Sequence, residues 1–455
     1  MSISIEAATA VAQPTRTRQL YAAIWRWHFY AGMIFAPFLV ILAITGGIYL
    51  FKPQIESVMY KDYYYVQQGG QQLTVQEQIQ KMNAVYPEAK LSKVKPSYAS
   101  DRSTEVEVSN QGKTLLVYVN PYNGNVLGTL DPNTKLMQLI RNFHGKLMVG
   151  TTGDRIIELT ACWAMILLIT GVYLWWPRGR KSIYGIILPR IKQGKRTFWR
   201  DMHAVTAFWL SLFIAALIVT GLPWSGVLGT YIGKSATYPD GMFSFMPTKL
   251  QSTVPTKDVV SGVPWAAEQL PIPNSTPGIA GAISVEQVMQ LDRVKELAPG
   301  YQIALPKNEK GVYTIYSTTA DPKKQATLHI DQYSGKILAD QKFQDFSFMA
   351  KAVTLGIALH QGELFGVTNQ IACLLVCLGI ILVAISGVVM WWLRKPAGRV
   401  AAPPLPKDFK MVKWVALITI ALGIVMPLVG ISLLIVLILD ALIIRRIPGL
   451  KRLVG

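Results

Sequence analysis

Two histidines, His144 and His360, stand at the same place in two copies of one sequence pattern. In the first copy, His144 is followed after 6, 27 and 31 residues by Gly150, Gly171 and Trp175. In the second copy, His360 is followed at the same three spacings by Gly366, Gly387 and Trp391. Packing alone would preserve the apolar character of such a segment, but not a polar residue at one position. We infer that the histidines are the reason for the shared register.

Two further histidines, His28 and His203, mark a second repeat. Each precedes an apolar run and is followed 17 residues later by a Thr-Gly pair, Thr45-Gly46 in the first case and Thr220-Gly221 in the second. The fifth histidine, His329, lies in a predicted strand, where we expect it to pack or to face solvent.

These four histidines could supply the axial ligands of haem. Two neutral imidazoles from facing helices suit a six-coordinate haem iron, with one nitrogen on each face of the ring. No Cys-x-x-Cys-His motif occurs, so such a haem would be b-type and held noncovalently. Small residues near the histidines would leave room for a flat macrocycle: Gly32, Gly145, Gly150, Ala204, Gly362 and Gly366.

Two other sites remain open for the same histidines, a divalent-metal site and a proton relay. A metal-transport site would normally add carboxylates or thiolates, and few are at hand. Glu158 lies inside the second apolar run, and Glu363 follows His360 by three residues. An ionisable residue within a span is a functional candidate by default, but Glu158 could equally cap a helix. A purely structural role of the histidines is the last alternative.

The elements that must position these residues are membrane spans. The chain has 455 residues, of which 51% are hydrophobic and only 16% charged, which is unusual for a soluble protein. A spanning helix takes about 20 apolar residues. Runs long enough for at least one crossing lie at 29–51, 156–176, 204–224, 371–393 and 411–444. The first run is too long for a cleaved signal and is expected to be retained.

The distribution of charge predicts how the spans are oriented. Residues 177–203 carry eight Lys and Arg against one acid, and residues 394–413 carry six against one. The long segments 52–143 and 227–359 are nearly balanced. Because positive loops stay in the cytoplasm, the N-terminus and the basic loops are expected there and the two long segments outside. The net charge of +19 is therefore no sign of a nucleic-acid partner.

The histidines then fall into two pairs, His28 with His203 at the cytoplasmic edge and His144 with His360 at the outer edge. His144 precedes the apolar core of its span by about 12 residues, or roughly 18 Å of unbroken helix. Such a helix would lift an outer haem clear of the bilayer. We therefore expect a break or bend near Gly150–Gly153.

The two outer segments predict repeated α+β domains. In each, a helix is followed by alternating strands and a turn with glycine, and residues 118–127 align with residues 329–338 at a constant offset of 211. Residues 231–283, rich in Pro, Ser and Gly, are expected to form an irregular insertion. The plan is therefore span, domain, span, twice over.

Two remaining features concern the C-terminal run and the cysteines. Pro427 interrupts the run, and a hairpin there would return the basic tail to the cytoplasm and give six spans in place of five. Cys162, Cys373 and Cys377 all lie in apolar runs and are expected to pack as small hydrophobes, with no disulfide or metal site implied.

The sequence thus predicts a polytopic α-helical membrane protein with a four-helix haem-binding core, two outer α+β domains and a C-terminal helical hairpin. Its expected parts are a disordered cytoplasmic N-terminus (1–20), a first span (21–52), a first outer domain (53–143), a second span with an outer lead-in (144–177), a basic cytoplasmic loop (178–199), a third span (200–226), a second outer domain (227–359) with the insertion 231–283, a fourth span with an outer lead-in (360–394), a cytoplasmic linker (395–410), a hairpin (411–446) and a cytoplasmic tail (447–455).

The pattern His-x₅-Gly, Thr/Ser-Gly-Val and Trp-Trp, with the turn motif Tyr-x-Gly-x-Val/Ile-Leu, resembles the PepSY-associated transmembrane family over residues 20–396. This family includes iron-regulated inner-membrane proteins and di-haem ferric-siderophore reductases. The resemblance implies a bacterial inner-membrane protein whose two large periplasmic domains are PepSY-like. It also implies b-type haem, with two haems expected, bound by the matching histidines His28, His144, His203 and His360.

We therefore expect an oxidoreductase that carries electrons across the membrane, from a cytoplasmic reductant or a quinol to a periplasmic ferric siderophore or other ferric chelate. No glycine-rich dinucleotide fingerprint follows a strand, so NAD(P)H binding is not expected. The alternatives are a non-enzymatic sensor or regulator, in which PepSY domains bind a partner and the spans only anchor them in lipid, and a metal or proton transporter.

Overall fold

The computed structural model describes residues 16–178, 182–236, 254–268, 270–278, 281–395, 412–444 and 446–447. Predictions that concern residues 1–15, the linker after residue 395, the last eight residues and part of the insertion lie outside the described residues. The chain divides into two compact units. The first holds residues 1–43, 158–218 and 378–455, and the second holds residues 44–157 and 219–377.

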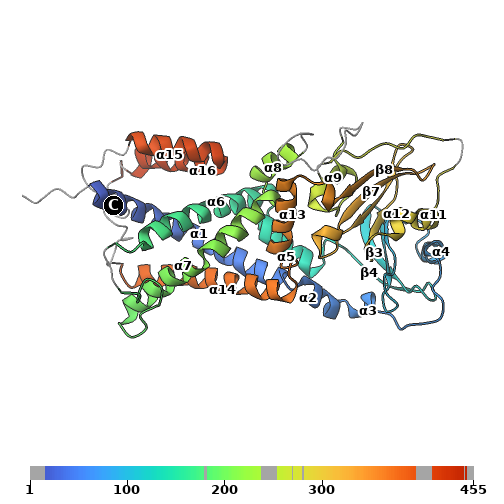
Figure 1. Cartoon of the computed structure of the whole chain (residues 1–455), viewed down its shortest axis with the longest axis horizontal. Coiled ribbons are helices and arrows are strands. Elements are labelled where there is room, and N and C mark those ends of the chain that lie inside the picture. The colour runs from blue at the N-terminus through green and yellow to red at the C-terminus, as the bar shows by residue number, and fades with distance from the viewer. Residues whose placement is uncertain are drawn as a thin grey trace, which may run out of the picture. The chain divides into compact units, whose positions relative to one another are not determined.

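Four helices in the described part of the chain are long and apolar enough to cross a membrane (Figure 1). They are α1 (Arg16–Tyr49), α6 (Gly150–Trp175), α7 (Lys195–Gly221) and α14 (Val367–Trp392). The shortest have 26 residues, or about 39 Å of helix, which exceeds the roughly 30 Å hydrocarbon core. The four helices coincide with the first four predicted spans. Because α1 begins at Arg16, the last residues of the segment predicted to be disordered are helical.

The helix is interrupted before the second span, so that His144 lies on a separate helix, α5 (Leu136–Lys146). Leu147 and Met148 have left-handed backbone angles, with φ of 48° and 59°, and α6 begins at Gly150 with φ of 62°. The break therefore falls at residues 147–150, just before the expected place. A Cβ atom on Gly153 would collide with the backbone carbonyl at the end of α5, so this glycine permits the close approach of the two helices.

The fourth span is preceded by the same kind of break. His360 is the last residue of α13 (Phe348–His360), and the loop to α14 contains Gly362 and Gly366 with φ of 75° and 59°. Gly366 corresponds to Gly150 in the repeat, which explains the fixed His-x₅-Gly spacing. In both copies the glycine lets the chain turn from a short helix into the span.

The two predicted outer domains share one antiparallel sheet of eight strands, in the order β4-β3-β2-β1-β5-β6-β7-β8. The strands are β1 (Lys90–Lys95), β2 (Thr104–Asn110), β3 (Lys113–Val119), β4 (Val126–Leu130), β5 (Gln302–Ala304), β6 (Val312–Ser317), β7 (Ala326–Asp331) and β8 (Ile337–Lys342). The halves join where β1 pairs with β5, with Val94 opposite Ile303. The sequence repeat predicted the two halves but not their union.

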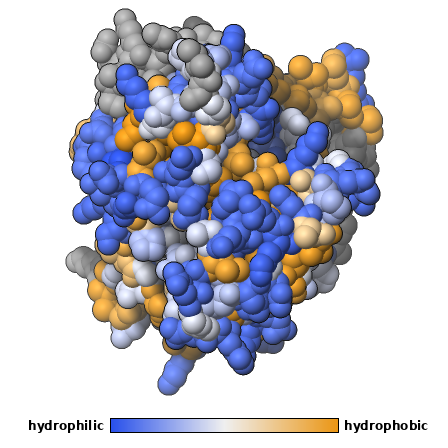
Figure 2. All heavy atoms as spheres, turned by 90° about the vertical axis from the view of Figure 1, so that its right-hand side faces the viewer, coloured by the Kyte–Doolittle hydropathy of each residue, from blue (hydrophilic) through white to orange (hydrophobic). Residues whose placement is uncertain are grey.

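One hydrophobic core serves both halves of the sheet. The helices α4 (Val75–Val85), α11 (Val285–Gln290) and α12 (Asp292–Lys295) bury Ile79, Met82 and other apolar residues against the valines and isoleucines of one sheet face. Capping boxes fix the first turns of α4 and α11. Figure 2, which views the right-hand side of Figure 1, shows a mainly hydrophilic surface with hydrophobic patches.

The repeated turns are built alike in the two halves. Gly124 and Gly335 have φ of 75° and 70°, as the turn motif predicts. His329 takes the place of Tyr118, and both side chains are almost fully buried, so His329 packs in the domain interior and does not face solvent.

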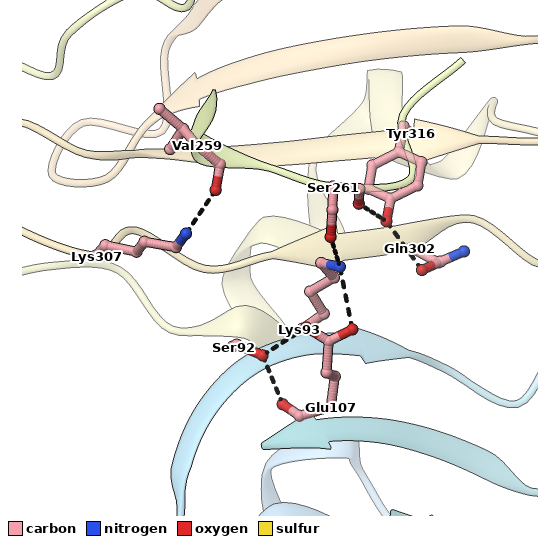
Figure 3. A network of polar contacts seen from close by, with 8 residues as sticks. All are labelled: Ser92, Lys93, Glu107, Val259, Ser261, Gln302, Lys307 and Tyr316. Atoms are coloured by element: carbon pink, nitrogen blue, oxygen red, sulfur yellow. Dashed lines mark hydrogen bonds and ion pairs between the residues drawn. The ribbon is translucent and has the colours of Figure 1, made fainter. Parts of the chain in front are cut away.

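The described second half of the predicted insertion packs against the sheet. Residues 255–268 and 270–272, with α9 (Thr256–Val259) and α10 (Trp265–Glu268), cover the second face of β5 and β6 through Val260, Val263 and Ile272. Figure 3 shows the polar contacts that fasten this segment to the junction of the half-sheets. The Lys93 ammonium donates to Glu107 at 3.0 Å and to Ser261 at 2.9 Å. Scattered apolar residues at no regular spacing supply this contact, which the sequence did not predict.

The C-terminal run turns back at Met426, between α15 (Val412–Val425) and α16 (Pro427–Leu439). Gly423 and Gly430 pack closely across the turn. Trp163 of α6 donates its indole N–H to the Ser432 hydroxyl at 3.1 Å. Each arm is about 20 Å long, shorter than the bilayer core, so six full crossings stay a prediction.

The remaining described helices are short: α2 (Lys52–Met59), α3 (Lys61–Tyr64), η1 (Leu222–Trp224), α8 (Leu228–Ala236), η2 (Pro322–Lys324), η3 (Phe343–Asp345) and η4 (Asp440–Ile444).

Candidate functional site

His28 of α1 and His203 of α7 lie close together, with ring centres 6.3 Å apart and ring planes at 89°. Both rings belong to the first compact unit. The structure therefore brings together the two histidines that sequence reasoning paired at the cytoplasmic edge.

The hydrogen bonds of His28 fix its tautomer. Its Nδ1 lies 3.0 Å from the Thr170 hydroxyl oxygen, and that hydroxyl donates its own hydrogen to the Ile166 carbonyl at 2.7 Å. With that hydrogen engaged, the Thr170 oxygen can accept a hydrogen bond from His28 Nδ1–H. In a neutral imidazole the other nitrogen, Nε2, then carries a lone pair.

His203 is held in the same tautomer by α14. Its Nδ1 lies 2.8 Å from the Val383 carbonyl oxygen, which can only accept, so Nδ1 carries the hydrogen. The Ser386 hydroxyl lies 3.5 Å from the same nitrogen and donates to the Val383 carbonyl. Both rings of the pair thus keep Nε2 available as a ligand atom, the arrangement in which a metal-bound histidine is usually oriented.

A glycine lies behind each of these rings. A Cβ atom on Gly171 would stand 3.2 Å from His28 Cε1, and one on Gly387 would stand 3.4 Å from His203 Cε1. Each glycine directly follows the residue whose hydroxyl faces Nδ1, Thr170 or Ser386. The hydroxyl orients the imidazole and the glycine makes room for it, which gives the Thr/Ser-Gly pair a physical reason that sequence reasoning had missed.

The outer histidines have the same surroundings on the reciprocal helices. His144 Nδ1 lies 2.9 Å from the Thr45 hydroxyl, and His360 Nδ1 lies 3.2 Å from the Thr220 hydroxyl. Cβ atoms on the following glycines, Gly46 and Gly221, would stand 3.3 Å and 3.1 Å from the Cε1 atoms of these rings. Each histidine is thus held by the Thr/Ser-Gly pair of the neighbouring span. The pairing of His144 with His360 stays a prediction.

The donor set and the spacing of the first pair fit a haem iron. An iron bound to one imidazole nitrogen on each side at about 2 Å, a usual metal–imidazole bond length, needs ring centres roughly 6 Å apart. The observed separation is 6.3 Å.

Of the small residues expected to leave room for a macrocycle, Gly145 has open space beside it, whereas a Cβ atom on Gly362 would press on Leu50 and Gln370. Gly362 therefore serves helix packing.

A buried carboxylate anchors the basic loop beside His203, and sequence reasoning missed it. Asp201 of α7 is inaccessible to solvent and accepts hydrogen bonds from the backbone N–H and guanidinium of Arg190 and from the guanidinium of Arg200. The only sign in the sequence was that Asp201 is the single acid in a basic segment. The pKa of the Arg190 guanidinium is raised by its hydrogen bonds to this carboxylate.

The other candidates lie apart from this arrangement or pack within helices. Glu158 is buried in α6, and Glu363 lies in the loop between α13 and α14, where burial raises its pKa and the Lys52 charge opposes that effect. The three cysteines are buried free thiols in the described structure. Cys373 accepts a hydrogen bond from the Asn369 amide at 3.2 Å.

Comparison with known protein families matches residues 25–394 to the PepSY-associated TM region. The chain belongs to this family. The match takes in most of α1, the three other long apolar helices and all eight strands, so this PepSY-associated protein is a membrane protein with four candidate transmembrane helices and an antiparallel sheet region. No curated protein matches this PepSY-associated protein.

Proposed function

We propose that this protein is a di-haem b electron conduit of the bacterial inner membrane, which reduces a ferric chelate in the periplasm. The observation that carries the proposal is the His28–His203 pair, two rings 6.3 Å apart whose Nδ1 atoms are both held by acceptors. Through their Nε2 atoms, these two imidazoles would hold a haem iron without a further protein ligand.

Bound b-type haem would supply reversible one-electron chemistry. His28 and His203 would hold one haem and His144 and His360 the other. Thr170, Thr45 and Thr220 would orient three of the imidazoles, and the Val383 carbonyl would orient that of His203. On the continuous helix α1, His28 and Thr45 are 17 residues apart, a rise of about 26 Å.

The direction of transfer follows from the charge distribution. The basic segment 177–203 favours the cytoplasm, so the His28–His203 pair would receive electrons from a cytoplasmic reductant or a quinol. The sheet domain would then lie in the periplasm, where the acceptor arrives. A ferric siderophore or similar chelate suits this role, because ferrous iron is bound less tightly by hard oxygen ligands and is released.

The test is anaerobic oxidation of the pre-reduced protein by ferric chelates, with the ferrous iron trapped by a ferrous-specific chelator. We expect one ferrous ion for each electron lost by the protein. If ferric chelates leave the reduced protein unchanged although haem is bound, the reductase function is wrong. If no haem is bound, the result favours a sensor or regulator built on the sheet domain.

A further inference from the structure

Trp224 lies at the end of the third span, with its ring against that of His360. It closes the short helix η1 that follows α7. The two ring centres are 6.2 Å apart and the ring planes make an angle of 62°. Trp224 is the last residue of the third candidate span (Lys195–Trp224), and 41% of it is exposed. One indole thus touches a proposed haem ligand and reaches the molecular surface.

The turn that carries Trp224 is rigidly built. Pro223 is buried and restricts the backbone of η1. The Ser225 hydroxyl donates to the Leu222 carbonyl at 2.7 Å and accepts from the Gly229 backbone N–H at 3.1 Å. A Cβ atom on Gly229 would meet the Pro223 carbonyl at 2.5 Å, so the next helix packs closely on the turn. These contacts fix the backbone from which the indole projects.

The charges beside this turn cancel. Gly226 packs against the side chains of Asp154 and Arg155, and a Cβ atom there would collide with both. The guanidinium of Arg155 lies 3.0 Å from the carboxylate of Asp154. A ligand that approaches Trp224 therefore meets an aromatic surface and a neutralised ion pair, so that shape and stacking decide recognition more than charge does.

We propose that Trp224 is the docking platform on which the aromatic rim of a ferric chelate stacks, so that electrons leave the protein beside His360. This inference rests on the proposed reductase function and names the substrate class as chelates with aryl ligands, such as catecholates. In the step, the ferric ion gains one electron and becomes ferrous, and the reduced protein loses that electron. No bond to the protein forms, and no proton is transferred.

The first repeat offers a matched control. Its residue at the position of Trp224 is Tyr49, 175 residues earlier in the chain. Tyr49 is half-buried at the end of α1, and the Lys52 ammonium lies 5.9 Å from the centre of its ring. The two repeats thus differ at this position. The second repeat has an exposed indole beside a histidine, and the first has a half-buried tyrosine.

The experiment measures two quantities separately. One is the binding of a chelate that cannot be reduced, and the other is the oxidation of the protein by the ferric chelate. Gallium(III) complexes, which accept no electron under these conditions, are titrated into the haem-loaded protein by calorimetry, with one aryl and one aliphatic hydroxamate chelator. An aromatic contact of this kind is worth about 2- to 10-fold in affinity. We expect Trp224→Leu to weaken aryl-chelate binding by about that factor and to slow oxidation by the ferric form, while Trp224→Phe retains most of both.

Tyr49→Leu should leave both measurements unchanged, and the absorption spectrum of each variant shows whether haem is retained. Equal aryl-chelate binding by wild type and Trp224→Leu would overturn the platform. Equal loss for aryl and hydroxamate complexes would also overturn it, because stacking would then not be the cause. If wild type binds the gallium complex but is not oxidised by the ferric one, the reductase function fails and the docking site stands.

Discussion

At the scale of single residues, the hydrogen-bond partner of Nδ1 orients each imidazole. Thr170 holds His28 only through its hydroxyl oxygen, so Thr170→Val removes the acceptor while it preserves the volume of the side chain. Loss of such an orienting partner typically costs 10- to 100-fold in metal affinity. We expect haem to dissociate from the His28–His203 pair about that much more readily, measured by transfer of haem to an acceptor protein.

Thr170→Ser keeps the hydroxyl and should behave like wild type in the same transfer assay. If Thr170→Val retains haem as firmly as Thr170→Ser does, then the threonine does not orient His28.

The glycine behind each ring gives a second residue-scale prediction. In Gly171→Ala the new methyl group would stand 3.2 Å from His28 Cε1 and must displace the ring. We expect haem content to fall at this site while the helix itself is retained, measured by absorption and circular dichroism. Gly47→Ala is the control, because its nearest neighbour, Leu374, lies at an ordinary contact distance of 3.5 Å. Equal haem content in the two variants would refute a steric role of Gly171.

His329 predicts how the stability of the sheet domain depends on pH. Burial lowers its pKa from 6.5 to about 4. Between these values the unfolded chain binds more protons than the folded one, so stability should fall as the pH falls from 6.5 to 4 and level off below 4. The loss is on the order of 3 kcal/mol. Urea unfolding at several pH values measures it.

His329→Tyr, which copies the residue of the first half-sheet, removes the titrating group and should flatten this part of the pH profile. An unchanged slope in that variant would mean that other groups cause the dependence.

At the scale of elements, the sequence predicted those helices and turns that depend on local residue patterns. The apolar runs located the four spans, and Pro427 located the turn of the C-terminal hairpin. A length argument about His144 predicted a break that the structure has at residues 147–150. The packing of residues 255–268 and 270–272 was missed, because their contacts with β5 and β6 come from apolar residues without a helical or strand period.

The break before α6 carries a prediction of its own. Gly153 is the point where the end of α5 lies against α6, and a methyl group there would push the Lys146 carbonyl away. Gly153→Ala should therefore displace α5 and its histidine, with loss of the haem that His144 holds and retention of the one at His28. Spectra of Gly153→Ala and Gly171→Ala should show opposite losses. If both variants lost the same haem absorption band, the prediction of two independent haem sites would be contradicted.

At the scale of the whole molecule, the sequence repeat predicted the order of spans and domains. It did not predict that the two outer domains join in one sheet. Span, domain and span recur, and a Thr/Ser-Gly pair lies beside each of the four histidines, although the closer partner of His203 is the Val383 carbonyl. The single eight-stranded sheet was not foreseeable, since it depends on two residue pairs between β1 and a three-residue strand about 200 positions later. No local pattern specifies a contact of that range.

The central claim is that two haems are held by two histidine pairs. It is tested most directly by haem content and reduced-minus-oxidised spectra of the purified protein and of its four single His→Ala variants. We predict two b-type haems per chain, with the same haem lost in His28→Ala and His203→Ala, and the other lost in His144→Ala and His360→Ala. Absence of haem from the wild-type protein, or loss of different haems in His28→Ala and His203→Ala, would contradict the account.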